Sequence, residues 1–219
     1  MREIIGAAFV SLDGVMQAPG NPDEDQSGGF PHVGWLGPVG DDGLGNQVGT
    51  LFHQPFDLLL GRRTFEIFAA YWPYVPAEHW VAAAFARARK YVLSGQDIDL
   101  SWAGSERLAG IDDVVRTKAN EGPPLIIQGS ASLYPQMLAR DLIDRLVLMT
   151  APVLLGQGKR LFGEGTAPGN WRLTEHRVSA SGMAMATYTR AGALQTGRIG
   201  PDDPSPAERA RRARWASDG

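Results

Sequence analysis

The chain has 219 residues, 43% of them hydrophobic, and a net charge of −3 at pH 7. This length suits one globular domain with a small appendage, and the balance of charge gives no basic field of the kind that holds a nucleic-acid backbone. Because cysteine is absent, disulfides and cysteine-ligated metal sites are excluded. Neither a signal peptide nor a long apolar run is present, so the sequence predicts a cytoplasmic protein without membrane or nucleic-acid partners.

The first half of the chain predicts alternating strands and helices, interrupted by one long loop. The apolar stretch from Glu3 to Val10 favours a strand buried on both faces. Residues 13–49 are rich in glycine, proline and aspartate, and apolar anchors such as Trp35 favour a lid folded over a ligand; a merely decorative insertion is the alternative. We then expect a helix over 45–53, a strand over 56–60, helices over 62–71 and 77–88, and a strand over 90–93.

The second half continues this alternation and ends in a hairpin. We expect a strand over 100–103, a helix over 111–119 that begins as early as Ser105, a strand over 125–128, a helix over 130–140, a strand over 144–151, and a hairpin from 171–179 and 182–190. This order is typical of an α/β fold with a mainly parallel central sheet flanked by helices and a C-terminal antiparallel hairpin. Residues 1–190 form the predicted domain, and residues 191–219 form an extended or partly disordered tail.

Arg62 and Arg63 stand where a buried strand ends in Gly61 and a helix begins. A helix N-terminus carries partial positive charge and unpaired N–H groups, so each arginine there costs about 0.3–1 kcal/mol unless an anion is bound. A phosphate removes that cost, and the Thr64 hydroxyl offers a further donor. Two guanidinium groups that simply reach into water are the alternative.

Other predicted strands also end in small or polar residues. They are Ser94, Gly95 and Gln96 after one strand, and Gln128, Gly129, Ser130 and Ala131 after another. The carboxyl ends of parallel strands meet at one edge of a sheet, where ligands bind. Glycines let backbone N–H groups approach a ligand closely, and hydroxyls donate to phosphate. The pattern predicts an elongated ligand with several phosphates.

The sequence lacks complete versions of the common nucleotide-binding and metal-binding motifs. The nearest match to a dinucleotide-binding fingerprint begins at Gly156 but has Leu161 in place of the last glycine and comes late in the chain. A Walker phosphate loop needs serine or threonine after Gly158-Lys159, where Arg160 stands. The histidines are widely spaced singles, so no metal site is predicted.

Three segments in order carry a family resemblance. Leu-Gly-Arg-Arg-Thr-Phe-Glu at 60–66, Val-Leu-Ser-Gly-Gln at 92–96 and Ile-Ile-Gln-Gly-Ser at 126–130 together resemble the NADPH-contact series of dihydrofolate reductases. Ser-Leu-Asp-Gly at 11–14 and the segment 152–162 are more similar to the reductase domain at the C-terminal end of riboflavin-biosynthesis proteins and to its stand-alone bacterial relatives. The resemblance covers about residues 1–190.

The resemblance implies an NADPH-dependent reductase of dihydrofolate reductase-like fold that forms a homodimer. Gly61, Arg62, Arg63 and Thr64 would hold cofactor phosphates, Ser94, Gly95 and Gln96 would lie near the adenosine ribose and its extra phosphate, and Gln128, Gly129, Ser130 and Ala131 would lie along the pyrophosphate and ribose. The family's paired glycines are replaced here by Gln128-Gly129-Ser130, so the closest backbone approach is expected at Gly129.

The substrate end is less defined by the sequence. Asp13, beside Gly14, is a candidate to bind or protonate a nitrogen-containing substrate, with capping of the following turn as the alternative. Trp35 is expected to stack on a planar substrate or to pack in the core. The substrate is a small heterocycle or a carbonyl or imine compound, as in 5-amino-6-(5-phosphoribosylamino)uracil reductase. A non-catalytic NADP(H)-binding or sensor protein, or a dihydrofolate reductase, is the alternative.

Overall fold

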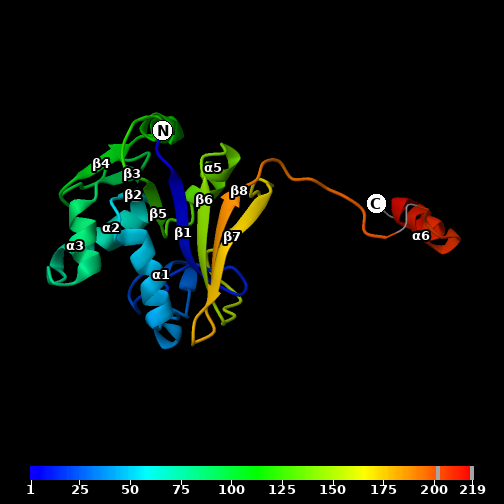
Figure 1. Cartoon of the computed structure of the whole chain (residues 1–219), viewed down its shortest axis with the longest axis horizontal. Coiled ribbons are helices and arrows are strands. Elements are labelled where there is room, and N and C mark those ends of the chain that lie inside the picture. Colours follow the sequence, from blue (N-terminus) through cyan, green and yellow to red (C-terminus); the bar gives the residue numbers. More distant parts are fainter. Residues whose placement is uncertain (201–202, 218–219) are drawn as a thin grey trace.

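All strands in the described residues belong to one 8-stranded sheet (Figure 1). The structure is a computed structural model that describes residues 1–200 and 203–217, so residues 201–202 and 218–219 of the predicted tail lie outside it. The strands are β1 (Ile4–Ser11), β2 (Asp57–Gly61), β3 (Lys90–Leu93), β4 (Ser105–Leu108), β5 (Leu125–Gln128), β6 (Arg145–Ala151), β7 (Trp171–Val178) and β8 (Ala184–Arg190). They lie in the order β4-β3-β2-β5-β1-β6-β8-β7.

Parallel pairing dominates the sheet. β1 lies between β5 and β6, with Ile5 opposite Ile126 on one side and Gly6 opposite Leu146 on the other. β2, β3 and β4 extend the parallel part, whereas β8 pairs antiparallel with β6 and β7. The prediction of a mainly parallel sheet with a C-terminal antiparallel hairpin is confirmed.

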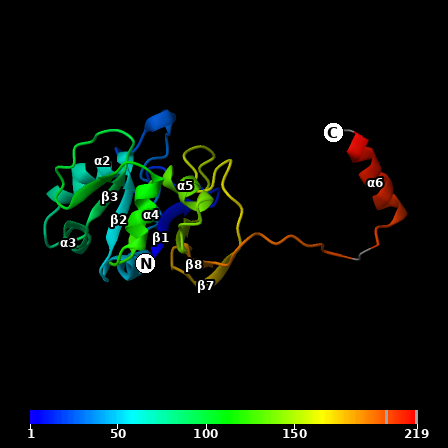
Figure 2. The same ribbon diagram turned by 90° about the horizontal axis from the view of Figure 1, so that it is seen from above.

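Helices cover both faces of the sheet (Figure 2). One face carries α1 (Asp42–Phe52), α2 (Arg62–Tyr71) and α3 (Trp80–Arg87), and the other carries α4 (Ile111–Ala119) and α5 (Leu133–Ala139). Successive strand residues point to opposite faces of the sheet. Ile5 and Ala7 of β1 therefore pack in the core beneath α1, α2 and α3, here called the first core, while Ile4 and Ala8 pack in the second core, beneath α4 and α5. Burial on both faces explains the uninterrupted apolar run that begins the chain.

β4 is the strand that the sequence did not predict. A strand is expected over 100–103, and a helix over 111–119 with an earlier start at Ser105 as the alternative. Residues Ser105–Leu108 instead pair with β3, and α4 has the bounds Ile111–Ala119. Trp102 instead packs as a buried loop anchor in the first core. β4 lies at the sheet edge and buries only Leu108 among its residues, so it lacks the run of apolar residues that marks the inner strands.

The segment 13–49 is more ordered than the expected loop. It contains 3-10 turns at Ser27–Gly29 and Gly37–Val39, and it leads into α1 earlier than predicted. The helix begins there because the Asp41 carboxylate accepts a hydrogen bond from Leu44 N at 3.0 Å and caps the first turn. A further 3-10 turn, Trp72–Tyr74, follows α2.

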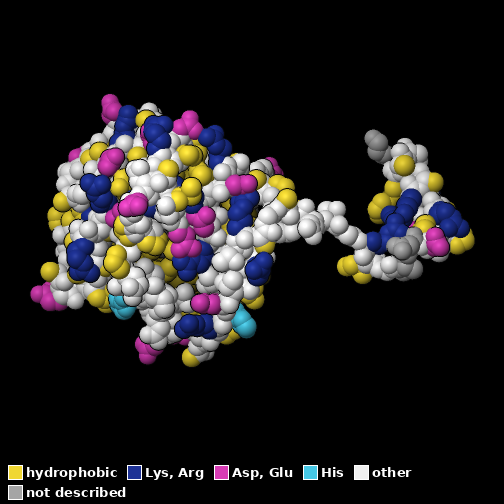
Figure 3. All heavy atoms as spheres, turned by 45° about the horizontal axis from the view of Figure 1, so that its top comes forward, with side chains coloured by type: hydrophobic (Ala, Val, Ile, Leu, Met, Phe, Trp, Pro, Cys, Tyr) yellow, Lys and Arg dark blue, Asp and Glu magenta, His cyan; other side chains and the backbone are white. Residues whose placement is uncertain are grey.

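The chain leaves the sheet after β8 and ends in α6 (Pro206–Ser217), which lies apart from the domain (Figures 1 and 2). The segment predicted as an extended or partly disordered tail thus contains a helix. Ser205 Oγ accepts from Glu208 N at 3.2 Å and caps the helix, and Glu208 pairs with Arg211 one turn later at 2.6 Å. Figure 3 shows the basic side chains gathered on this separate helix.

Candidate functional site

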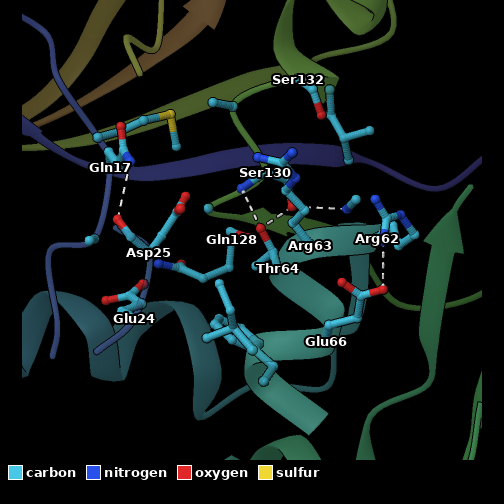
Figure 4. A pocket seen from close by; sticks show the side chains of 18 of the residues that line it. Gln17, Glu24, Asp25, Arg62, Arg63, Thr64, Glu66, Gln128, Ser130 and Ser132 are labelled. Atoms are coloured by element: carbon cyan, nitrogen blue, oxygen red, sulfur yellow. Dashed lines mark hydrogen bonds and ion pairs between the residues drawn. The ribbon is translucent and has the colours of Figure 1, made fainter. Parts of the chain in front are cut away.

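A groove with a volume of about 1390 Å³ lies at the carboxyl ends of β2, β3 and β5 and beside the end of β1 (Figure 4). Every residue predicted to bind the cofactor lines it: Gly61, Arg62, Arg63, Thr64, Ser94, Gly95, Gln96, Gln128, Gly129, Ser130 and Ala131. These residues come from separate parts of the chain and meet because the strands that precede them run parallel in one sheet. The sequence pattern therefore identified one continuous wall of the groove.

The start of α2 forms a basic part of this wall. Among the described residues no side chain caps the helix, whose N-cap is Gly61, so its first N–H groups are open to an anion. Arg62 Nη1 lies 2.9 Å from Glu66 Oε1, and Arg63 Nη1 lies 3.5 Å from Ser27 Oγ. Both guanidinium groups thus have protein partners, which the alternative of simple exposure to water did not foresee.

Ser130 joins the β2–α2 and β5–α5 junctions. Its hydroxyl accepts from Gly61 N at 2.9 Å, and its own N–H donates to Thr64 Oγ1 at 3.0 Å. Gly129 and Ser130 both have positive φ, 65° and 59°. A Cβ at Gly129 would lie 3.1 Å from Thr64 Cγ2, so the backbone approaches α2 closely there. These contacts fix the geometry of the polar wall.

Ser94 and Gln96 form a tight turn after β3. Ser94 Oγ donates to Gln96 O at 2.7 Å and accepts from Gln96 N at 3.2 Å. Ser94 N donates to Leu108 O at 3.0 Å, which ties the turn to β4. A Cβ added to Gly95 would have no heavy atom within 4 Å among the described residues. The turn therefore presents an open backbone surface to the groove.

Gln128 brings an unpaired polar atom into the groove. Its side chain is 9% exposed, and its Oε1 atom has no hydrogen-bond partner among the described residues. Figure 4 shows this side chain extending from the end of β5 toward the loop that carries Glu24 and Asp25. A buried acceptor of this kind is normally paired, so a bound molecule with an N–H or O–H donor fits here.

The opposite part of the groove is aromatic, and of its rings the sequence indicates only Trp72, which suits either stacking on a planar substrate or packing in the core. Phe52, Phe68, Trp72 and Phe85 line it together with Phe9 of β1. Phe68 stacks on Phe85 with ring centroids 5.7 Å apart, and Trp72 meets Phe85 edge-on at 5.0 Å. Each ring belongs to a helix or strand whose apolar residues equally suit the core, so spacing alone could not single them out.

Residues 16–25 form the remaining wall, and two side chains fasten this loop. Gln17 Nε2 donates to Asp25 O at 3.1 Å and to Ser27 O at 2.9 Å, while its Oε1 accepts from Lys159 N at 3.0 Å. Lys159 Nζ contacts Asp25 Oδ2 at 2.5 Å and Ser27 Oγ at 2.7 Å. Part of the predicted lid segment thus lies along the groove, held to the loop after β6.

Asp13 and Gly14 lie away from the groove, and the predicted substrate role of this pair is not supported. The Asp13 carboxylate accepts hydrogen bonds from Ser11 Oγ at 2.6 Å, Gly156 N at 2.8 Å and Leu155 N at 3.1 Å. The bond from Ser11, aided by the two backbone bonds, lowers the pKa of Asp13 to about 2. This carboxylate therefore stays ionised and fastens the turn after β1, which is the capping alternative.

Trp35 is also absent from the lining of the groove. It is 8% exposed, and its Nε1 donates to Gln17 O at 2.8 Å. Gly34 N donates to Ala18 O at 2.8 Å in the same region. Trp35 is therefore a core anchor that supports the loop wall from behind, and the expected stacking on a substrate is not supported.

The described residues contain neither a metal-binding cluster nor a membrane-spanning helix. No group of three or more histidine, aspartate or glutamate side chains is placed to hold a metal ion. None of the helices in that part of the chain has the length and apolar character needed to cross a bilayer.

Solved structures of other proteins share this fold. A putative riboflavin biosynthesis protein from Shewanella sp. PV-4 superposes with a TM-score of 0.64 at 20% identity, covering 86% of this chain and 99% of that one. A dihydrofolate reductase from Enterococcus faecalis, complexed with NADP(H) and RAB-propyl, gives 0.56 at 15% identity over 86% and 96% of the two chains. A pyrimidine reductase-like protein from Corynebacterium diphtheriae gives 0.56 at 18% identity over 87% and 92%. The chain thus has the dihydrofolate reductase-like fold.

Sequence similarity shows the family to which the chain belongs. The chain belongs to the RibD C-terminal domain family, whose model matches residues 2–185. The uncharacterized protein YyaP of Bacillus subtilis is 27% identical over 195 residues, covering 85% of this chain and 94% of YyaP. YwjB of the same organism is 29% identical over 173 residues, covering 78% and 89%. The resemblance to a reductase family is thereby confirmed.

Proposed function

We propose that this protein is an NADPH-dependent reductase of a small heterocyclic, carbonyl or imine substrate. The observation that carries the proposal is the convergence of the residues after β2, β3 and β5 on one groove, together with its aromatic end. Membership of a reductase family of this fold supports it. The dihydrofolate reductase with the same fold is complexed with NADP(H), which supports the choice of cofactor.

The groove suits a dinucleotide cofactor in its donors and its shape. The uncapped start of α2, Arg62 and Arg63 would hold phosphate groups, and Gly129, which has no side chain, packs closely against Thr64 in the same wall. The Ser94–Gln96 turn would lie beside the adenosine ribose and its phosphate. The unpaired Gln128 Oε1 supports a ligand donor in the middle of the groove. NADPH would supply a hydride to the substrate.

The aromatic end supports a flat substrate. Phe52, Phe68, Trp72 and Phe85 offer apolar faces, while Phe9 comes from the strand end beside Gln128. Aromatic walls exclude water and bury planar rings, both of which favour hydride transfer to a C=N or C=O group. The pyrimidine reductase-like protein of the same fold supports a heterocycle as the substrate class.

Titration of the purified protein with NADPH and NADH, followed by nicotinamide fluorescence, tests the cofactor. Arg62→Ala removes a charge-assisted phosphate contact and should weaken NADPH binding about 10- to 100-fold. Arg87→Ala, an exposed arginine on α3 outside the groove, is the matched control. Equal affinity of the wild type for both cofactors would contradict the assigned phosphate pocket.

A panel of cyclic imines, dihydropterins, pyrimidines and aldehydes tests the reaction. Consumption of NADPH with any member supports a reductase, whereas tight NADPH binding without any oxidation would favour the non-catalytic alternative. We also propose that the protein is a homodimer in the cytoplasm, which light scattering and cell fractionation test.

A further inference from the structure

The carboxylates that line the groove differ in their partners. Glu66 pairs with Arg62 at 2.9 Å, and Asp25 pairs with Lys159 at 2.5 Å. Asp23 and Glu24 line the groove as well, and neither has a salt-bridge partner among the described residues; Asp23 is exposed, whereas Glu24 is partly buried. An unpaired carboxyl group in a partly buried site is the kind of acid that holds a proton.

Glu24 is held by only one of its two oxygens. Its Oε2 accepts from Gly20 N at 2.7 Å and from Asn21 N at 3.3 Å, whereas Oε1 accepts no hydrogen bond from the described residues. Burial, with the nearby charge of Asp25, raises the pKa of Glu24, while the Lys159 ammonium contributes to lowering the pKa of Asp25. Neighbouring acids with pKa values pushed apart are a common basis for acid catalysis.

The loop carrying Glu24 is fastened on the same side of the groove that Gln128 faces. Asp25 follows Glu24 in the chain. Gln17 donates to the Asp25 backbone carbonyl, and Lys159 pairs with the Asp25 carboxylate. Gln128 extends toward this loop from β5 (Figure 4), and its unpaired Oε1 independently points to a ligand in this part of the groove. Gln128 of β5 lies opposite Ala7 of β1. Phe9, two residues beyond Ala7 on β1, also lines the groove.

We propose that Glu24 is the proton donor of the reduction, in the place that the sequence assigned to Asp13. This inference rests on the proposed reductase function. The substrate carbon receives a hydride with its electron pair from the reduced nicotinamide, so the C=N or C=O π bond breaks. Its electron pair moves to the heteroatom, which takes the proton from the Glu24 carboxyl group. Solvent then reprotonates the carboxylate, and the nicotinamide leaves oxidised.

The Glu24→Gln variant tests this role because its amide oxygen can still accept from Gly20 N and Asn21 N. Glu121→Gln is the matched control: it makes the same chemical change at an exposed position before β5, outside the groove. Both variants should keep the NADPH affinity of the wild type within about twofold, since neither lies in the phosphate-binding wall.

The first readout needs no substrate. Carbon-13 NMR of protein labelled at glutamate carboxyl groups follows each titration, and the Glu24 signal is the one missing from Glu24→Gln. We expect its midpoint above that of the urea-unfolded chain; a midpoint at or below it would overturn the proposal. The charged groups around this loop are Asp23, Asp25, Lys159 and Arg63. The titration is repeated in Asp25→Asn, where the midpoint should fall as the neighbouring negative charge is removed.

The second readout is single-turnover reduction of the panel compound that the wild type reduces fastest. Glu24→Gln should lose about 100-fold or more in rate, the usual contribution of a general acid, and should lose the alkaline fall in rate that the wild type shows. Equal rates and pH profiles would refute the role of Glu24 alone. A wild type that binds no NADPH or reduces no panel compound would instead refute the proposed function, and the donor role with it.

Discussion

Substitution of Ser130 offers a test of how the polar wall is built. Ser130 is 7% exposed, and its hydroxyl accepts the hydrogen bond of Gly61 N at 2.9 Å. Ser130→Ala leaves this buried N–H without an acceptor, which costs about 1–3 kcal/mol of unfolding free energy. Alanine also keeps the left-handed backbone, φ 59°, that L-residues adopt at a cost of about 1–2 kcal/mol.

Ser130→Gly separates these two contributions. Glycine loses the same hydroxyl but relieves the left-handed cost, offset by about 0.5–1 kcal/mol for its greater freedom in the unfolded chain. We therefore expect Ser130→Gly to be more stable than Ser130→Ala by about 0.5–1 kcal/mol in urea unfolding, although both are weaker than the wild type.

Ser132→Ala is the control for this comparison. Ser132 is exposed in the same turn, and its hydroxyl makes no hydrogen bond within the described residues, so its loss should change stability by less than about 0.5 kcal/mol. A Ser130→Gly variant at least as destabilised as Ser130→Ala would refute the assignment of backbone strain to this residue.

Two further predictions concern ionisable groups. Asp13→Asn should lower the melting temperature but leave the alkaline fall of the panel reaction unchanged, because the pKa of Asp13 is held at about 2 and its carboxylate carries no proton to donate; loss of that pH dependence would return Asp13 to the proton-donor role. Burial lowers the pKa of Lys90 to about 8 in the folded protein, against about 10.4 in the unfolded chain. Below pH 8 the folded state therefore bears the whole free-energy cost of the buried charge, and this cost falls as the pH rises to about 10. Wild-type stability should therefore gain about 2 kcal/mol relative to Lys90→Met between about pH 7.5 and 9.5; parallel urea-unfolding curves would contradict this.

The polar wall of the groove could be predicted because its signals are local. The helix over Arg62–Tyr71 and the strand over Leu125–Gln128 have the bounds that the sequence predicts. Each is marked by an apolar run that ends in glycine or a polar residue, and parallel pairing then brings the strand ends together. Asp13 shares this position at a strand end, but its turn bends toward the loop after β6, and only the tertiary contacts with Leu155 and Gly156 decide that.

The substrate end could not be predicted because its residues meet through contacts distant in sequence. Glu24 lies in an irregular segment without periodicity, and its neighbour Asp25 is paired with Lys159, far along the chain. The aromatic residues Phe68 and Phe85 carry the helical spacing expected of a core face, which they also serve. No pattern in the sequence distinguishes a core ring from one that lines a groove.

The two walls of the groove are consequently fixed by different means. The phosphate side depends on strand ends and on Ser130, which links two strand–helix junctions within the central sheet. The loop side depends on Gln17 and Lys159, whose contacts converge on Asp25 and Ser27. Substitutions in residues 16–25 can therefore change the acid and the shape of the substrate end while the phosphate side keeps its geometry. We therefore expect cofactor affinity and substrate choice to be separable, so that variants at Glu24 and Arg62 report on different halves of the proposed reaction.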